Sequence, residues 1–132
     1  MDEVYQFLKD ARTFYIATCD ADQPRVRPFG FVMKYKGRLY FCTGWSKPFA
    51  QQMKRNPRFE ICACNENAQW LRLSGTGIFE DDLAAKQQAF AEAPGVAALY
   101  QSPENPNFAL FYLSQGIAQF CSFTAPTRTI AL

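Results

Sequence analysis

The segment from Thr43 to Lys47 gathers the kinds of group that bind anions in proteins. It joins a predicted strand to a predicted helix, so hydroxyls, an ammonium and free backbone N–H groups meet at a helix N-terminus. Pro48 removes one N–H donor from the first turn, whereas Ser46 and Lys47 keep theirs. An ordinary helix, with Ser46 as its cap and Lys47 in solvent, explains the same residues. The segment alone therefore leaves both interpretations open.

Two arginines, Arg25 and Arg27, lie two residues apart in a predicted strand and project from the same face of it. An anion over that face would account for them, because a guanidinium such as that of Arg27 grips phosphate through two parallel hydrogen bonds. Pro28 and Gly30 interrupt the strand and leave backbone groups available to a planar ligand. The competing interpretation is an edge strand protected by arginine and proline.

Trp70 and Arg72 share the polar face of a later strand. They would line a ligand groove or form cross-strand surface pairs, and their spacing favours neither.

Asp81 and Asp82 are adjacent and indicate helix capping, and no carboxylates are spaced for acid–base catalysis. The sequence contains neither GxGxxG nor a P-loop, so it does not predict a Rossmann or Walker nucleotide site.

The chain contains no histidine. This excludes a Ser-His-Asp triad, a Cys-His dyad, haem ligation by histidine and histidine general-base catalysis. Five cysteines, an odd number scattered among apolar residues, predict reduced thiols packed in a core, and hence a reducing cytoplasm. Cys62 and Cys64 could share a strand face, but without histidine or a second cysteine pair nearby we expect no zinc site.

Composition limits the class of protein. With 132 residues, 48% of them hydrophobic and 16% aromatic, we expect one globular domain spanning residues 1–132. A net charge of +2 without a Lys/Arg block argues against nucleic-acid binding. The N-terminus lacks the features of a secretory signal, and no segment is apolar for long enough to span a bilayer, so we expect no membrane partner.

The elements predicted around these motifs are mostly strands. We expect helices at residues 3–11, from a Ser46 cap to 55, and from an Asp81–Asp82 cap to 92, where Pro94 and Gly95 break the last one. Residues 102–107 are expected to form a loop. The expected strands are 13–18, 25–35, 39–43, 59–64, 69–79, 108–113 and 117–123, with hairpins over 25–43 and 108–123. The predicted fold class is therefore mainly β, a closed or partly closed β-barrel with short helices. We favour a barrel over a sandwich because closure removes the exposed edges of an open sheet.

These residues, in this order and spacing, resemble the pyridoxamine 5′-phosphate oxidase-like proteins, and especially the short members related to general stress protein 26 or to nitroimidazole resistance. The resemblance covers nearly the whole chain. It rests on residues 25–31, 36–43, 46–47, 52–54, 56–57 and 70–75, and extends to 123–124 and 128–129.

The resemblance implies an FMN-binding split β-barrel that forms a homodimer, with one FMN in each of two clefts at the subunit interface. By position, the phosphate would be held by Arg27, Thr43, Ser46 and Lys47. The remaining implied contacts are backbone of Pro28 and Phe29 at the isoalloxazine ring, Cys42 beside the ribityl chain, and Trp70 beside the flavin.

The chain also departs from the family pattern. Pro48 stands where members often have a second basic residue, and Val32 stands where the true oxidases have a substrate-binding lysine. Their C-terminal Arg-x-His motif is missing, as is the histidine that nitroimidazole-resistance members use near the flavin. These departures argue against pyridoxamine 5′-phosphate oxidation itself.

The function that the resemblance implies is that of a cytoplasmic, FMN-dependent oxidoreductase. It would pass a hydride between NAD(P)H, or another small donor, and a small-molecule acceptor through flavin N5. Two alternatives stay open: an FMN-binding, stress-associated protein without turnover, and the same fold carrying F420 or haem.

Overall fold

The structure is a computed structural model that describes all 132 residues. Its elements follow the order α1 (Asp2–Ala11), β1 (Phe14–Asp20), β2 (Gln23–Phe29), β3 (Met33–Tyr35), β4 (Arg38–Gly44), α2 (Pro48–Arg55), β5 (Arg58–Cys64), β6 (Trp70–Glu80), α3 (Leu83–Glu92), α4 (Pro94–Tyr100), β7 (Phe108–Cys121) and β8 (Arg128–Ala131). None of the four helices combines the length and apolar character that a bilayer crossing requires.

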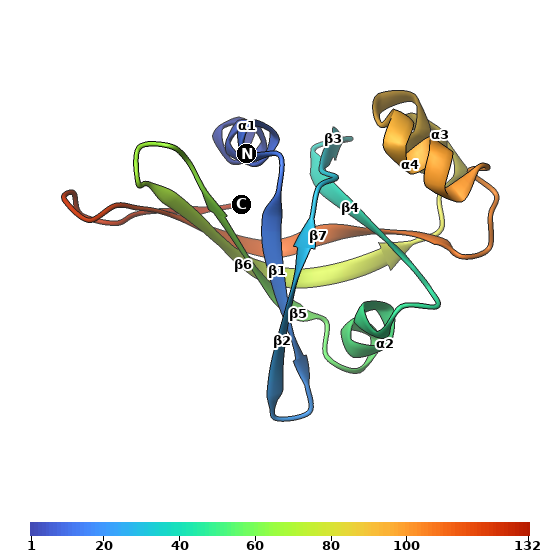
Figure 1. The fold of residues 1–132 in the computed structure, drawn as a ribbon, viewed down its shortest axis with the longest axis horizontal. Coiled ribbons are helices and arrows are strands. Elements are labelled where there is room, and N and C mark those ends of the chain that lie inside the picture. The colour runs from blue at the N-terminus through green and yellow to red at the C-terminus, as the bar shows by residue number, and fades with distance from the viewer.

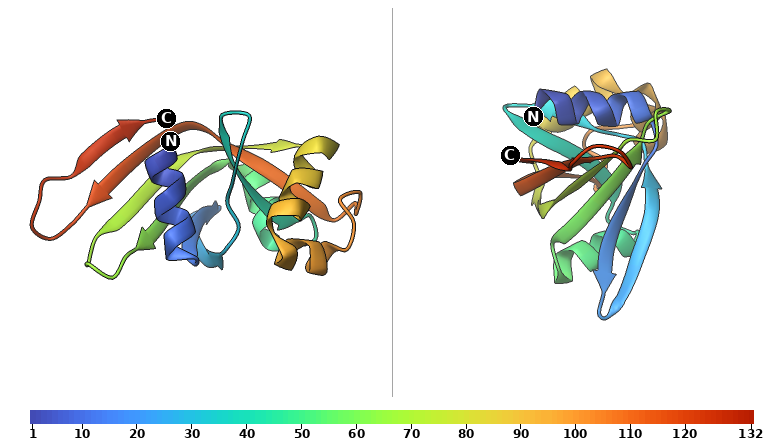
Figure 2. Two further views of the ribbon diagram at one scale, coloured as in Figure 1. Left: turned by 90° about the horizontal axis from the view of Figure 1, so that it is seen from above. Right: turned by 90° about the vertical axis from the view of Figure 1, so that its left-hand side faces the viewer.

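The strands form one antiparallel sheet in the order β2-β1-β5-β6-β7-β4-β3. β8 pairs with the C-terminal half of β7, beyond the part of β7 that pairs with β4. The sheet is strongly twisted and rolled (Figures 1 and 2), and α1 packs against β5, α2 against β1 and β4, and α3 against β3. This mainly β architecture with short helices is a split barrel, which confirms the predicted fold class.

The feature of this topology that matters most for the site is where β2 and β3 lie. They are consecutive in the chain, yet they stand at opposite edges of the sheet. The chain crosses from one edge to the other through residues 30–32, which belong to no strand. We call this crossing segment the seam.

Two apolar clusters hold the fold together. The larger fills the inside of the sheet with aromatic rings, among which Phe41 and Phe111 stack with centroids 5.5 Å apart. The smaller lies between β3, β4 and β7 on one side and α3 and α4 on the other, and includes Tyr40 and Phe108. Because Phe41 and Tyr40 point to opposite faces, β4 is buried on both sides, which fixes the position of its end at Gly44.

The predicted hairpin over residues 25–43 is wrong in its first half. β2 pairs with β1 through a tight turn in which Ala21 has φ 54°, and only β3 forms a hairpin with β4, across Lys36 and Gly37. The predicted single strand 25–35 is interrupted after Phe29, where Pro28 and Gly30 had indicated a break in the ladder.

The predicted hairpin over residues 108–123 is also wrong. β7 runs unbroken from Phe108 to Cys121, and Gln115, with φ 53°, lies where the register with β6 shifts between Ser74 and Thr76. The turn-like composition of residues 114–116 therefore produces a bulge, because β6 pairs with β7 on both sides of it.

Two further expectations need correction. Pro94 does break α3, but it also begins α4, since proline suits the first turn of a helix. The five cysteines are free, as expected, yet they are not all packed in the core. Cys19, Cys62 and Cys64 are exposed on the outer face of the sheet, and Cys42 and Cys121 are partly buried.

Gly75 lies at the bulge where the register between β6 and β7 shifts, and no side chain fits there. A Cβ there would lie 2.9 Å from the backbone oxygen of Ser114 and would clash with Leu113. Gly75→Ala should therefore reduce the free energy of unfolding by about 1–3 kcal/mol, as overpacking does. Urea unfolding measures this. Gly95→Ala is the matched control, because its Cβ would meet nothing within 4 Å, and equal effects of the two changes would contradict the packing at the bulge.

Candidate functional site

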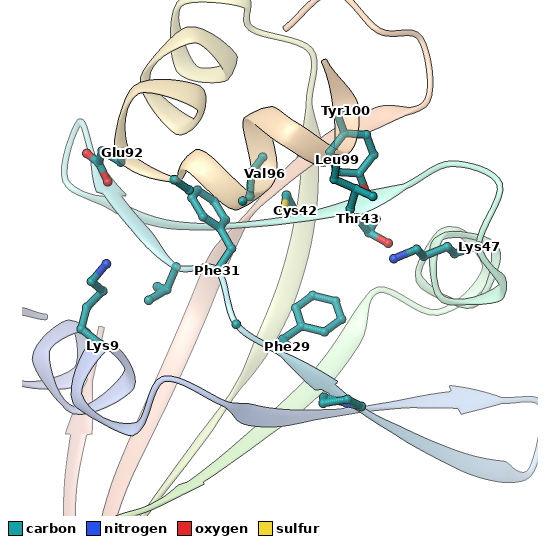
Figure 3. Close-up of a pocket in the computed structure, with 15 residues that line it drawn as sticks. Lys9, Phe29, Phe31, Cys42, Thr43, Lys47, Glu92, Val96, Leu99 and Tyr100 are labelled. Carbon is teal, nitrogen blue, oxygen red and sulfur yellow. The ribbon is translucent and has the colours of Figure 1, made fainter. Parts of the chain in front are cut away.

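A pocket of about 470 Å³ opens at the seam, between α4, the end of β4 and the start of α2 (Figure 3). Its lining residues come from four separate stretches of the sequence, namely Lys9 and residues within 28–32, 42–47 and 92–100. They are Lys9, Pro28, Phe29, Gly30, Phe31, Val32, Cys42, Thr43, Lys47, Glu92, Ala93, Gly95, Val96, Leu99 and Tyr100.

The pocket has an apolar middle and two polar ends. Phe29 and Phe31 come from the seam and its flank, and Val96, Leu99 and Tyr100 come from α4. Thr43 and Lys47 lie at one end, which we call the anion end, and Lys9 and Glu92 lie at the other (Figure 3).

The anion end is built differently from the prediction. Lys47, not Ser46, is the N-cap of α2, and no side chain caps this helix. The N–H groups expected to be free are in use, because that of Ser46 donates to Asn107 Oδ1 at 2.9 Å and that of Lys47 donates to the Gly44 oxygen at 3.0 Å. The groups left for a ligand are the Thr43 hydroxyl and the Lys47 ammonium, which point toward each other in Figure 3. Lys47 takes part in no ion pair.

Arg27, a predicted phosphate contact, does not line the pocket. It is half-buried, with its guanidinium 4.9 Å from the ring centroid of Phe49 in the first turn of α2. It donates to Thr18 Oγ1 at 2.8 Å and to Gln52 Oε1 at 2.7 Å. The Thr18 hydroxyl donates in turn to Gln52 Oε1 at 2.6 Å. No carboxylate pairs with Arg27, and desolvation lowers its pKa from the ordinary value.

Arg25, predicted to share the face of Arg27, has a different environment. It is exposed and pairs with Asp20 at 3.2 Å. Its charge is therefore balanced by a surface partner, whereas that of Arg27 is surrounded by neutral acceptors. Of the two arginines, only Arg27 has the surroundings of an anion-binding group.

Pro28, Phe29 and Cys42 line the pocket as the predicted contacts of a flavin would. Burial raises the pKa of the Cys42 thiol to about 12, although the nearby Lys47 opposes the shift. Cys42 is therefore a neutral thiol at physiological pH and contributes apolar wall.

Two further predicted site residues, besides Arg27, do not line the pocket. Ser46 is exposed and does not line the pocket. Trp70 begins β6, away from the seam, and packs against Phe123 with ring centroids 5.1 Å apart. Arg72, on the same face, pairs with Glu60 of β5 at 3.1 Å, so these two residues form cross-strand surface contacts within the chain.

The family model for pyridoxamine 5′-phosphate oxidase matches residues 1–115. The chain belongs to this family. The expected family membership is thereby confirmed. No curated protein matches the chain.

Solved structures agree with this assignment. A NimC/NimA family protein from Clostridium acetobutylicum is 38% identical, over 100% of this chain and 92% of its own, with a TM-score of 0.95. The general stress protein 26 of Bacillus anthracis is 15% identical, over 99% and 97% of the two chains, with a TM-score of 0.80. A pyridoxamine 5′-phosphate oxidase-related, FMN-binding protein from Nostoc punctiforme is 18% identical, over 99% and 93%, with a TM-score of 0.66. The chain described here is similar to that NimC/NimA protein although it contains no histidine itself.

Several residues of the site were missed by sequence reasoning. Thr18 and Gln52, the partners of Arg27, occupy positions that apolar periodicity assigns to the core. A polar residue on the buried face of α2, next to Phe49 and Met53, was the available signal for Gln52. The wall supplied by α4 could not be found, because α4 itself was not predicted.

The environment of Cys42 predicts slow alkylation. With a pKa of about 12, roughly one thiol in 10⁴ is a thiolate at pH 8, and the thiolate is the reactive form. Iodoacetamide at pH 8 should modify exposed Cys19 and Cys64 first and leave Cys42 intact, as peptide mass spectrometry would show. All five cysteines should react in urea. Modification of Cys42 as fast as Cys19 in the folded protein would mean that its thiol is not shielded.

Proposed function

We propose that this chain binds FMN in the seam pocket and works as a flavin-dependent oxidoreductase. The observation that carries the proposal is the half-buried guanidinium of Arg27, which has neutral partners only and contacts Phe49 in the first turn of the helix whose N-cap is Lys47. A phosphate dianion is the ligand that such a pair of cations suits. The FMN-binding relative from Nostoc punctiforme supports the same ligand.

The residues present fit FMN at both of its ends. Arg27, Lys47 and the Thr43 hydroxyl supply two positive charges and a hydrogen-bond donor for the phosphate. Phe29 offers its ring to an aromatic ligand, and the seam offers backbone freed from any strand at Gly30. The neutral thiol of Cys42 between these regions suits an uncharged chain better than a charged one.

Bound FMN would supply the redox chemistry by exchanging a hydride at N5 with NAD(P)H or another small donor. The task left for the chain is to bind, to orient and to exclude water. Phe29 would hold the ring system and shield one side of it. A direct hydride exchange needs no acid–base side chain, which agrees with a chain that contains no histidine and whose pocket thiol is neutral.

We propose further that two chains form a homodimer through the outer face of the sheet. Tyr15 is 52% exposed there, Val26 67% and Ile117 48%, and Phe123 is 84% exposed against Trp70. Such apolar exposure supports an interface. In a dimer, Trp70 would approach the flavin site of the partner subunit, which would explain why it lies away from the pocket of its own chain.

We also propose a reducing, cytoplasmic setting, which the five free cysteines support.

The phosphate contact can be tested by comparing FMN with riboflavin, which lacks the phosphate. Lys47→Gln should weaken FMN binding about three- to tenfold, because one exposed charge-assisted contact is lost, and should leave riboflavin affinity unchanged. Arg27→Gln should cost FMN affinity more than tenfold, because its guanidinium is partly desolvated. Flavin fluorescence titration measures both.

The matched control is Lys54→Gln, which removes the same charge from the same helix. The Lys54 ammonium lies over the ring of Trp45, outside the pocket, so FMN affinity should change less than about twofold. Equal losses of FMN and riboflavin affinity in Lys47→Gln would contradict a phosphate at the anion end.

Turnover is tested by adding NADH or NADPH to the FMN-loaded protein without oxygen. The proposal predicts bleaching of the visible flavin absorbance by at least one of them, and its return when oxygen is admitted. Bound flavin that neither donor reduces would instead identify a protein that holds FMN without turnover. The spectrum of the protein as isolated distinguishes FMN from F420 and from haem.

A further inference from the structure

The end of the pocket opposite Lys47 carries two charges that the proposed flavin contacts do not use. Lys9 belongs to the last turn of α1, and Glu92 is the last residue of α3. Both line the pocket, and Figure 3 shows them at the same end, with Phe31 between them and Phe29. The proposed flavin contacts, at the seam and the anion end, include neither of these two residues.

These two charges are available to a ligand. Neither Lys9 nor Glu92 takes part in an ion pair, and both are exposed. The Glu92 carboxylate accepts one hydrogen bond, from Gln88 Nε2 at 2.8 Å. The Lys9 ammonium points toward Glu92 in Figure 3 without forming a salt bridge with it. Opposite charges thus stand on two walls of one opening.

Ordinary helix chemistry explains part of this. A lysine in the last turn of α1 interacts favourably with the helix dipole, and Gln88 and Glu92 are a common pair four residues apart. That chemistry places the side chains on their helices. It does not account for two helices from different parts of the chain bringing opposite charges to the rim of one apolar pocket.

We infer that the Lys9–Glu92 end recognises the second reactant of the proposed flavin reaction, and that this reactant is a small, dipolar, apolar-bodied molecule. Its anionic group would bind Lys9, its ammonium or N–H group would bind Glu92, and its body would lie against Phe31 and Val96. The inference rests on the proposed function, because it names the substrate class of the same pocket.

The charge balance of this end separates such a molecule from a polyanion. Lys9 and Glu92 cancel each other, so the end as a whole does not attract a ligand with several negative charges. A single anion would gain from Lys9 but would be repelled by Glu92. A dipolar ligand gains from both.

Three probes that share one benzene ring and differ in their charged groups test this on the FMN-loaded protein by isothermal titration calorimetry. They are 4-(aminomethyl)benzoate, which is dipolar, 4-methylbenzoate, which is anionic, and 4-methylbenzylammonium, which is cationic. The dipolar probe should bind most tightly. Lys9→Gln should weaken the dipolar and anionic probes about three- to tenfold and spare the cationic one. Glu92→Gln should weaken the dipolar and cationic probes by a similar factor and spare the anionic one.

Lys54→Gln and Glu104→Gln are the controls, since each removes one charge from an exposed position outside this pocket. Both should leave the three affinities within about twofold. The inference would be overturned if neither Lys9→Gln nor Glu92→Gln changed the affinity for the dipolar probe. It would also be overturned if either change lowered the affinities for all three probes equally.

The same titrations on protein that has not been loaded with FMN separate this inference from the flavin proposal. Should the protein fail to bind FMN yet show the charge-specific pattern, the recognition end stands and the flavin proposal fails. Should FMN bind with the predicted dependence on Lys47 while the probes ignore Lys9 and Glu92, the flavin proposal stands and the inference about the substrate fails.

Discussion

A half-buried positive charge without a negative partner is the feature on which this site depends. The guanidinium of Arg27 is held by neutral oxygens, those of Thr18 and Gln52 above all, and by the ring of Phe49. These contacts engage both terminal nitrogens of the guanidinium but leave its charge uncompensated, which is costly away from water. They also explain why a hydroxyl and an amide occupy positions that face the core in β1 and α2. In the proposed function the phosphate of FMN provides the missing charge, and Lys47 adds a second cation at the start of the same helix.

The pocket next to this charge follows from the topology of the sheet. Because β2 and β3 lie at opposite edges, the chain between them must cross the barrel without pairing, and its backbone and the ring of Phe31 stay available. α3 and α4 then cover β3 and β4 through a small apolar cluster of their own and supply the far wall of the pocket. A site built from four separate stretches of the chain is therefore set by long-range packing.

Local patterns in the sequence predicted most elements, and distant partners caused most errors. The alternation in β1, β5 and β6 and the spacing of Phe49 and Met53 were sufficient for those strands and for α2. The predicted hairpins joined residues 25–35 to 39–43 and residues 108–113 to 117–123. In the structure β2 pairs with β1, and β7 is one strand that pairs with β6 along its length. Ser46 was expected to cap α2, but Asn107, sixty-one residues away, takes its N–H. Trp70, in turn, was expected beside the flavin, but within the chain it packs against Phe123.

The central claim is that two cations hold a phosphate dianion at the start of α2. The phosphorus NMR signal of bound FMN tests it directly when it is followed with pH, because nearby positive charge favours the dianion over the monoanion. The dianion of a free phosphate monoester takes up a proton and becomes the monoanion at about pH 6. The account predicts that bound FMN remains a dianion to about pH 5 or below, and that Arg27→Gln moves the transition back toward the free value. A bound phosphate that titrates as it does in free FMN would contradict the account.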